Sequence, residues 1–252
     1  MRSLLLSVLL LVLSNTLLAQ QAKQGNYTVT AAGTVLNAYT NVTSNIAVNA
    51  TTLSVGSNTL TNSYFTTNLG AGDLILIIQM QGASMDIITN PAVPAAQGGW
   101  GGNYTVSNSA WADMGNMGNY RSDWGAVTSY GSSGKYEYAE VLSVSGTNVI
   151  NVRCALKNSY TASGHVQVVR VPRIGNLTLN ANSTIIPLQW DGSIGGIVAL
   201  EVNGALNFGT NSKISASGLG FRGGITDNDT GGPAASATEK GKPGYSASTE
   251  GA

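Results

Sequence analysis

The chain has 252 residues, of which only 10% are charged, and its twelve Lys and Arg residues balance its twelve Asp and Glu residues. This balance gives no electrostatic basis for binding nucleic acid, whose phosphates require clustered positive charge. The single cysteine excludes an intrachain disulfide framework, so packing and backbone pairing must stabilise the fold.

Residues 1–19 have the pattern of a secretory signal peptide. Arg2 supplies a positive start, residues 4–13 form an apolar run broken only by Ser7, and Ala19 offers a small residue for cleavage. The run is shorter than the about 20 residues that a membrane span needs, and no later segment reaches that length. We therefore expect a secreted or cell-surface protein without a transmembrane segment after the signal peptide.

Residues 20–172 predict a β-rich domain. Apolar residues recur at every second position or in short runs, which is typical of strands rather than of amphipathic helices. The continuous apolar run 74–78 predicts a strand that is buried on both faces. Residues 136–144 and 148–156 predict a hairpin, and residues 165–171 predict a further strand that ends at Pro172.

Cys154 falls in the second strand of this predicted hairpin. It lies in step with Ile150, Val152 and Leu156 on one face of the alternating strand. A free cysteine behaves as a small apolar side chain. The pattern therefore predicts that Cys154 is buried in the core.

Residues 82–134 form a long insertion with little strand pattern and many aromatic residues. A loop of this length is usually functional or disordered, and disordered segments are poor in aromatic residues. Flat Trp and Tyr rings can stack on the apolar faces of sugars or anchor a protein partner. They can also hold the insertion against the sheet. The candidate ligand-contact residues are Trp100, Trp111, Trp124, Tyr104 and Tyr120.

Residues 173–222 contain an internal repeat. Residues 175–185 (GNLTLNANSTI) align without gaps to residues 204–214 (GALNFGTNSKI), 29 positions later. A repeat of this length indicates a solenoid, in which each coil buries its apolar face against the next. A plain β-sandwich edge is the alternative. In the solenoid, the inward side chains are Leu177, Leu179, Leu206, Phe208 and Ile214.

The expected fold class is therefore all-β, with a β-sandwich-like N-terminal region that leads into the first coils of a parallel β-solenoid. Residues 223–252 are rich in Gly, Ser, Thr and Ala and predict a flexible tail, either a linker or the point of truncation of a longer chain. Asp227 and Asp229 bring two carboxylates beside a Gly turn, which leaves calcium binding open there, although the full ligand spacing of a calcium loop is missing. We predict no cofactor and no metal site.

Signals for catalysis are weak. The one histidine, His165, is expected on a strand and has no acidic or cysteine neighbour at ligand spacing, so neither a zinc site nor a Ser-His-Asp triad has support. Asp191 lies in a Trp-Asp-Gly stretch that is typical of a turn. We therefore predict no catalytic residues.

Paired carboxylates are the remaining enzymatic option. Glu137 and Glu140 are an odd number of residues apart on one predicted strand, so they face opposite sides and cannot converge on one sugar. Glu140 falls in step with four other residues, and this places it on the side of the strand that is expected to be apolar. Those residues are Tyr136, Tyr138, Leu142 and Val144.

Several stretches resemble the N-terminal region of large adhesin-like extracellular proteins, found mainly in gliding and environmental bacteria of the Bacteroidetes type. They are residues 72–82 (GDLILIIQMQG), 136–137 (YE), 168–172 (VVRVP), 190–199 (WDGSIGGIVA) and 217–224 (SGLGFRGG). The resemblance covers roughly residues 64–224. It implies a secreted, β-rich surface protein whose longer relatives continue into a Gly-rich region, further modules and often a type IX sorting domain.

The leading hypothesis is a secreted cell-surface or extracellular-matrix protein with an adhesive or structural, non-enzymatic role. Its partners would be extracellular glycans or surface proteins. The alternatives are a polysaccharide-binding module that uses the aromatic insertion, and a polysaccharide-degrading enzyme built on a β-solenoid. The enzyme would need at least two acidic side chains that converge in a groove.

Overall fold

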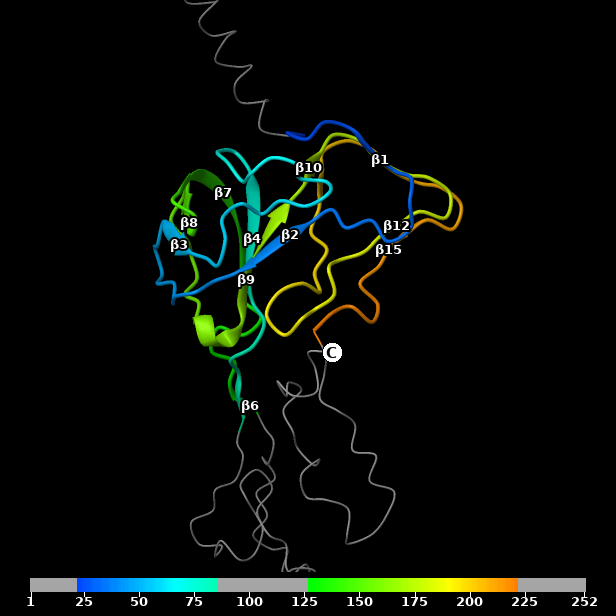
Figure 1. Ribbon diagram of the computed structural model, residues 1–252. Helices are drawn as coiled ribbons and strands as arrows, with labels where there is room; N and C mark the ends of the chain where they lie inside the picture. The colour runs from blue at the N-terminus through cyan, green and yellow to red at the C-terminus, as the bar shows by residue number, and fades with distance from the viewer. Residues whose placement is uncertain (1–21, 86–126, 222–252) are drawn as a thin grey trace, which may run out of the picture.

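The computed structural model describes residues 22–85 and 127–221 (Figure 1). In these ranges the chain forms strands and one short 3₁₀ helix, η3 (Ala162–Gly164). The prediction of an all-β chain is confirmed for these residues. Within the same ranges, no helix has the length and apolar character needed to cross a membrane.

Six antiparallel strands form one curled sheet. Their order is β2 (Ala38–Asn41), β9 (Val166–Val171), β4 (Leu74–Gln79), β7 (Tyr136–Ser145), β8 (Val149–Val152) and β3 (Thr52–Ser54). The two edges meet through an antiparallel bridge between Val42 and Val55, where Thr43 N donates to Ser54 O at 2.9 Å. We call this closed sheet the barrel; it replaces the two facing sheets of a sandwich. A separate antiparallel pair, β5 (Ser84–Met85) and β6 (Val127–Ser129), extends from it.

Strand β4 is the central element of the barrel, and both of its faces are buried, as the apolar run predicts. Ile75 and Ile77 point into the barrel core and have no exposed surface. On the opposite face, Leu76 packs with Val169 of β9 and with Ala199, which lies outside the barrel. A strand covered on both faces needs a continuous apolar run rather than an alternating one.

Beside the barrel, parallel strands pair at the spacing of the sequence repeat (Figure 1). Strand β11 (Leu177–Leu179) pairs with β14 (Leu206–Phe208), so that Leu177 lies opposite Leu206, its equivalent in the second copy of the repeat. Parallel pairs also join β10 (Arg173–Ile174) to β13 (Glu201–Val202) and β12 (Thr184–Ile185) to β15 (Lys213–Ile214). We call these paired segments, together with β1, the stack.

Strand β1 (Tyr27–Val29) belongs to the stack although it precedes the barrel in sequence. It pairs in parallel with β11, Tyr27 opposite Leu177 and Val29 opposite Leu179. From β1 onward, the chain therefore leaves the stack, forms the barrel and then returns to the stack. Residues 25–29 (GNYTV) match residues 175–179 (GNLTL) at Gly, Asn and Thr. This similarity between the two stretches is present in the sequence, but the barrel residues that separate them make it difficult to recognise.

Burial differs along the stack. Leu177 and Leu179 are fully buried, as the repeat predicts, and Ile214 is partly buried. The expected burial is wrong for Leu206 and Phe208, which are 43% and 54% exposed. These two residues lie in register with Leu177 and Leu179, but β14 has a described neighbour on one side only.

Two glycines of the repeat are explained by asparagine side chains of the preceding segment. Asn26 Oδ1 accepts a hydrogen bond from Asn176 N, and Asn176 Oδ1 accepts one from Ala205 N, each at 2.8 Å. A Cβ atom at Gly175 would meet Asn26 Oδ1, and one at Gly204 would meet Asn176 Oδ1. Glycine is therefore required at the two positions that lie against an asparagine side chain of the preceding segment.

Candidate functional site

The barrel is joined to the stack by two buried side-chain amides. Asn37 donates to Ala199 O at 2.7 Å and accepts from Ala199 N at 3.1 Å. Gln167 donates to Gly195 O at 3.0 Å and accepts from Gly195 N at 2.9 Å. Ala199 and Gly195 are not in a strand that pairs with the barrel, so each amide takes the place of the missing backbone partner. The buried N–H and C=O groups of these two residues are thereby hydrogen-bonded.

Tyr39 of β2 makes a third contact of this kind. Its hydroxyl donates to Ile197 O at 2.7 Å, and its ring packs in the apolar cluster between the barrel and residues 197–199. Burial raises the pKa of Tyr39 from 10.0 to about 12.

We predict that this tyrosine makes the fold sensitive to alkali. A tyrosine with a raised pKa in the folded state stabilises the fold fully below about pH 10, and this contribution is lost as the pH rises through about 12. The free energy of unfolding should therefore fall over this window, and Tyr39→Phe should make the fall shallower. Urea unfolding at a series of pH values, with tyrosinate absorbance recorded in parallel, measures both. An equally steep fall in the variant would contradict the assignment.

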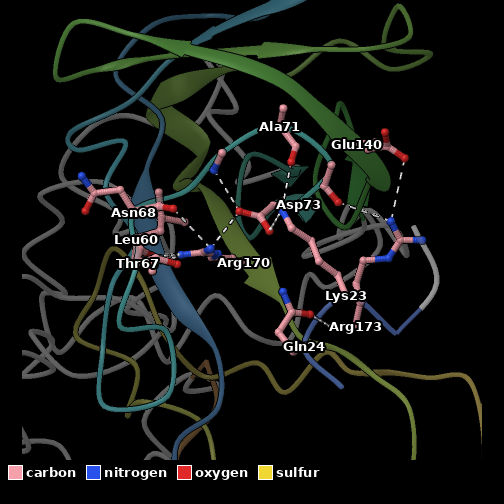
Figure 2. Close-up of polar contacts among 12 residues, drawn as sticks. Lys23, Gln24, Leu60, Thr67, Asn68, Ala71, Asp73, Glu140, Arg170 and Arg173 are labelled. Atoms are coloured by element: carbon pink, nitrogen blue, oxygen red, sulfur yellow. Dashed lines mark hydrogen bonds and ion pairs between the residues drawn. The ribbon is translucent and has the colours of Figure 1, made fainter. Parts of the chain in front are cut away.

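A buried carboxylate lies where β4 begins. Asp73 is 2% exposed; its Oδ2 accepts from Arg170 at 2.8 Å and from Gly70 N at 2.8 Å, and its Oδ1 accepts from Lys23 Nζ at 2.7 Å. Figure 2 shows Asp73 between the two cations, one from the barrel and one from the start of the chain. Asp73 thus links the segment before β1, which carries Lys23, to the barrel.

Arg170 of β9 is also 2% exposed, and its guanidinium is engaged with groups of the barrel. Besides Asp73, it donates to Leu60 O at 3.1 Å and to Thr67 O at 2.7 Å, and it lies 4.1 Å from the centre of the Phe65 ring. Burial lowers the pKa of Arg170, whereas the negative charge of Asp73 raises it. The pair therefore holds the 60–73 loop against β9.

Arg173 carries the network from the barrel into the stack. It donates to Glu201 of β13 at 3.1 Å, and it lies 3.8 Å from Glu140 of β7. Glu140 also pairs with Arg153 at 2.7 Å. Figure 2 shows the contact between Arg173 and Glu140. Each of these carboxylates is thus matched by a cation, which suits a structural connection between barrel and stack.

The outer face of β7 exposes a row of large apolar side chains. Tyr136, Tyr138 and Leu142 are 60%, 53% and 49% exposed. Their neighbours on the other face of the strand, Ala139 and Val141, pack in the barrel core. Because β7 lies next to β4 in a closed sheet, the backbone that carries these rings is fixed. We call the three exposed residues the β7 face.

These residues share the side of β7 that the sequence predicts to be apolar, and in the structure most of this side is exposed rather than packed in the core. The side that faces the core starts with Glu137 and the small Ala139, so the larger apolar residues lie outside. A β-bulge between Val141 and Ser143 then shifts the pairing, and Val144 packs against the core. An extra residue in one strand reverses the alternation that follows it.

The three acidic residues considered for catalysis each hold a different piece of the structure. Glu137 accepts from Lys157 N at 2.8 Å, Asn158 N at 3.0 Å and the Tyr160 hydroxyl at 3.0 Å. Asp191 accepts from the backbone N–H groups of residues 193 and 194, each at 2.8 Å, and so closes its own turn. Glu140 lies in the ion-pair network described above.

Two single residues differ from expectation. His165 is not in a strand: it follows η3 in the left-handed region, with φ of 51°, and β9 begins at the next residue. Its ring is edge-on to Trp190, with centroids 6.3 Å apart. Cys154 is exposed, not buried, because β8 ends at Val152 and the chain bends before the alternation can continue.

Some predicted site residues fall outside the described ranges. The five aromatic candidates of the insertion lie within residues 86–126, and Asp227 and Asp229 lie within residues 222–252. In residues 22–85 and 127–221, no group of three or more His, Cys, Asp or Glu side chains is arranged to hold a metal ion. The five candidates are Trp100, Trp111, Trp124, Tyr104 and Tyr120.

No protein-family model matches the chain, and no curated protein matches it. Among solved structures, the tailspike gp49 of Pseudomonas phage LKA1 is 15% identical over 64% of this chain, with a TM-score of 0.28. The tailspike gp61 of Pseudomonas phage phi297 is 11% identical over 76%, with a TM-score of 0.29. The gp54 tailspike of Acinetobacter baumannii bacteriophage AP22, solved with capsular saccharide, is 12% identical over 75%, with a TM-score of 0.28. The matches cover only 22%, 25% and 29% of the respective tailspikes.

Proposed function

We propose that this chain is part of a secreted cell-surface protein with an adhesive, non-enzymatic role, and that it contacts extracellular glycans through the β7 face. The exposed row of Tyr136, Tyr138 and Leu142 carries the proposal. Large apolar side chains grouped on one surface mark interaction sites. A tyrosine ring offers a flat apolar side to a sugar ring and a hydroxyl to its polar groups.

The spacing of the two rings suits an extended chain of sugars. Residues two apart on one face of a strand are about 7 Å apart along it, so two rings can contact successive parts of one polymer. Exposed polar side chains follow on the same sheet, where Asn151 donates to Ser143 at 3.0 Å. Such groups can give hydrogen bonds to hydroxyls beside the apolar contact.

The stack supports the structural part of this role. Three of its parallel pairs join segments that are separated by nearly the same interval, and we infer that they are the first coils of a parallel β-solenoid. The barrel is tied to these coils by the Asp73 network and by the amides of Asn37 and Gln167. A rigid attachment of this kind holds the β7 face in one orientation on an extended support.

The acidic residues support a non-enzymatic role. Glycoside cleavage needs two carboxyl groups about 5–9.5 Å apart that flank one bond. Glu137 and Asp191 are engaged with the backbone N–H groups of separate loops, and Glu140 is paired with arginines. Each of these three carboxylates thus has structural partners, which favours a structural role for all three.

Glycan binding provides the test of this function. We expect the double variant Tyr136→Ala/Tyr138→Ala to bind extracellular polysaccharides about tenfold or more weakly, since each ring contributes roughly 0.5–1.5 kcal/mol. Leu188→Ala, which removes a side chain that is 44% exposed on the stack side, is the matched control and should bind as the parent does. A glycan array followed by titration of the best ligand measures both. Parent protein that binds no glycan, or binding that survives the double change, would overturn the proposal.

A further inference from the structure

A cation lies in line with the rings of the β7 face. Along β7, the positions on the outer side are Tyr136, Tyr138, Glu140 and Leu142. Arg153, which follows β8, lies beside Glu140: its backbone N donates to Glu140 O at 2.8 Å, and its Nε donates to Glu140 Oε1 at 2.7 Å. The Arg153 guanidinium is therefore held on the outer side of β7, at a position between Tyr138 and Leu142.

Most of the Arg153 guanidinium is available to a ligand. The side chain is 48% exposed, and within residues 22–85 and 127–221 its two Nη groups donate to no protein acceptor. A guanidinium presents its N–H groups as a planar fork that fits both oxygens of a carboxylate. Glu140 holds the Nε side of this fork, so the Nη groups remain for a carboxylate from outside the chain.

The exposed charges around the β7 face are positive. Residues 130–160 contain three cations, all with exposed side chains, and two carboxylates that are both partly buried. The cations are Lys135, Arg153 and Lys157, and the carboxylates are Glu137 and Glu140. Exposed cations beside an apolar surface favour a negatively charged partner and increase its rate of association.

We propose that the glycan of the β7 face is acidic, and that a carboxylate of a uronic acid unit pairs with Arg153 while neighbouring sugar rings contact Tyr136 and Tyr138. This inference rests on the proposed function and names the class of its ligand. Positions two apart on a strand are separated by about 7 Å, so Arg153, beside Glu140, lies one such step beyond Tyr138. One extended chain of sugars can therefore contact the rings and the cation together.

Two forms of one polymer test the proposal. The first is polygalacturonate, and the second is the same polymer after reduction of its carboxyl groups to alcohols. We expect the parent protein to bind the acidic form about fivefold more tightly, as one partly exposed ion pair allows. The preference should shrink as salt is added, because exposed charges are screened.

The two members of one ion pair should have opposite effects on this binding. Arg153→Gln removes the fork and should weaken binding of polygalacturonate about fivefold, with little change for the reduced polymer. Glu140→Gln removes the carboxylate that competes for Arg153 and should strengthen binding of polygalacturonate. If the pair were only structural, both variants would weaken binding. Lys213→Gln, which removes an exposed cation from β15 in the stack, is the matched control and should bind as the parent does.

Four results would overturn the proposal. Parent protein that binds both polymers equally would exclude the acidic ligand and leave the proposed function intact. Weaker binding in both Arg153→Gln and Glu140→Gln would assign the pair a structural role. Dextran sulfate that binds as tightly as polygalacturonate would show attraction to any polyanion rather than to a uronic acid. Parent protein that binds neither polymer would also exclude the acidic ligand, and the proposed function fails with it only if the glycan array shows no other ligand.

Discussion

Asp73→Ala is expected to lower the free energy of unfolding by about 3–5 kcal/mol, because it leaves the Arg170 guanidinium buried without its counter-charge. Arg170 is 2% exposed and lies against the Phe65 ring, so it cannot turn to solvent without moving the 60–73 loop. The same change removes the side-chain acceptor of Gly70 N and one of the two acceptors of Lys23 Nζ, which also donates to Ala71 O. Loss of the ion pair with Lys23 should also loosen the segment that leads into β1.

Lys23→Ala is the matched control for this charge network. Its side chain is 35% exposed, and a pair of that exposure contributes about 0–1 kcal/mol. Urea unfolding of the two variants compares the loss of the buried carboxylate with the loss of its partly exposed partner. If Asp73→Ala costs no more than Lys23→Ala, the network does not hold the barrel together as described.

The second large effect is expected inside the stack. Leu179 is fully buried between Val29 and Phe208, its partners in the two adjacent strands. Leu179→Ala removes these contacts and leaves a cavity, which should cost about 2–5 kcal/mol. The cost should approach the upper value if the parallel backbone ladder on both sides prevents collapse of the cavity.

Leu142→Ala makes the same change at a side chain that is 49% exposed on the barrel, and it should cost under about 1 kcal/mol. Thermal or urea unfolding followed by circular dichroism measures both variants. Similar losses in the two variants would mean that the stack has no packed interior at Leu179. A biphasic transition in Leu179→Ala alone would show that the stack melts separately from the barrel.

Local patterns in the sequence predicted the elements that depend on local chemistry. Period-two alternation and the apolar run 74–78 predicted strands. A strand that is buried on one face has apolar residues at every second position, and one that is buried on both faces has a continuous apolar run. The repeat at 175–185 and 204–214 predicted the register of β11 on β14, because stacked segments meet equivalent neighbours at equivalent positions.

Contacts between distant residues were not predictable in this way. β1 pairs with β11 although the whole barrel lies between them in sequence, and the three identical matches that join them are too few to recognise without coordinates. The same holds for Asp73 and Arg170, which are 97 residues apart. Arg170 is a charged residue in an apolar strand, but nothing in either local sequence indicates that the two charges meet.

The β7 face was not predicted from the sequence, because the larger apolar side chains of this strand do not lie on the side that faces the core. On β7, the sequence predicted that Tyr136, Tyr138 and Leu142 share the apolar side of the strand, but Glu137 and Ala139 occupy the side that faces the core. Glu137 is tolerated there because loop N–H groups and the Tyr160 hydroxyl donate to it. A polar residue with backbone partners can thus replace an apolar one on the side of a strand that faces the core, and it reverses the apparent amphipathicity.

Strands β1 and β11 are adjacent in the stack although the whole barrel separates them in sequence. Spin labels at Thr28→Cys and Thr178→Cys, on a Cys154→Ser background, test it most directly, since these threonines pair across β1 and β11. Neighbouring strands are about 4.8 Å apart, and we predict strong dipolar coupling between the two labels that disappears on unfolding. Labels that do not couple in the folded protein would contradict the account.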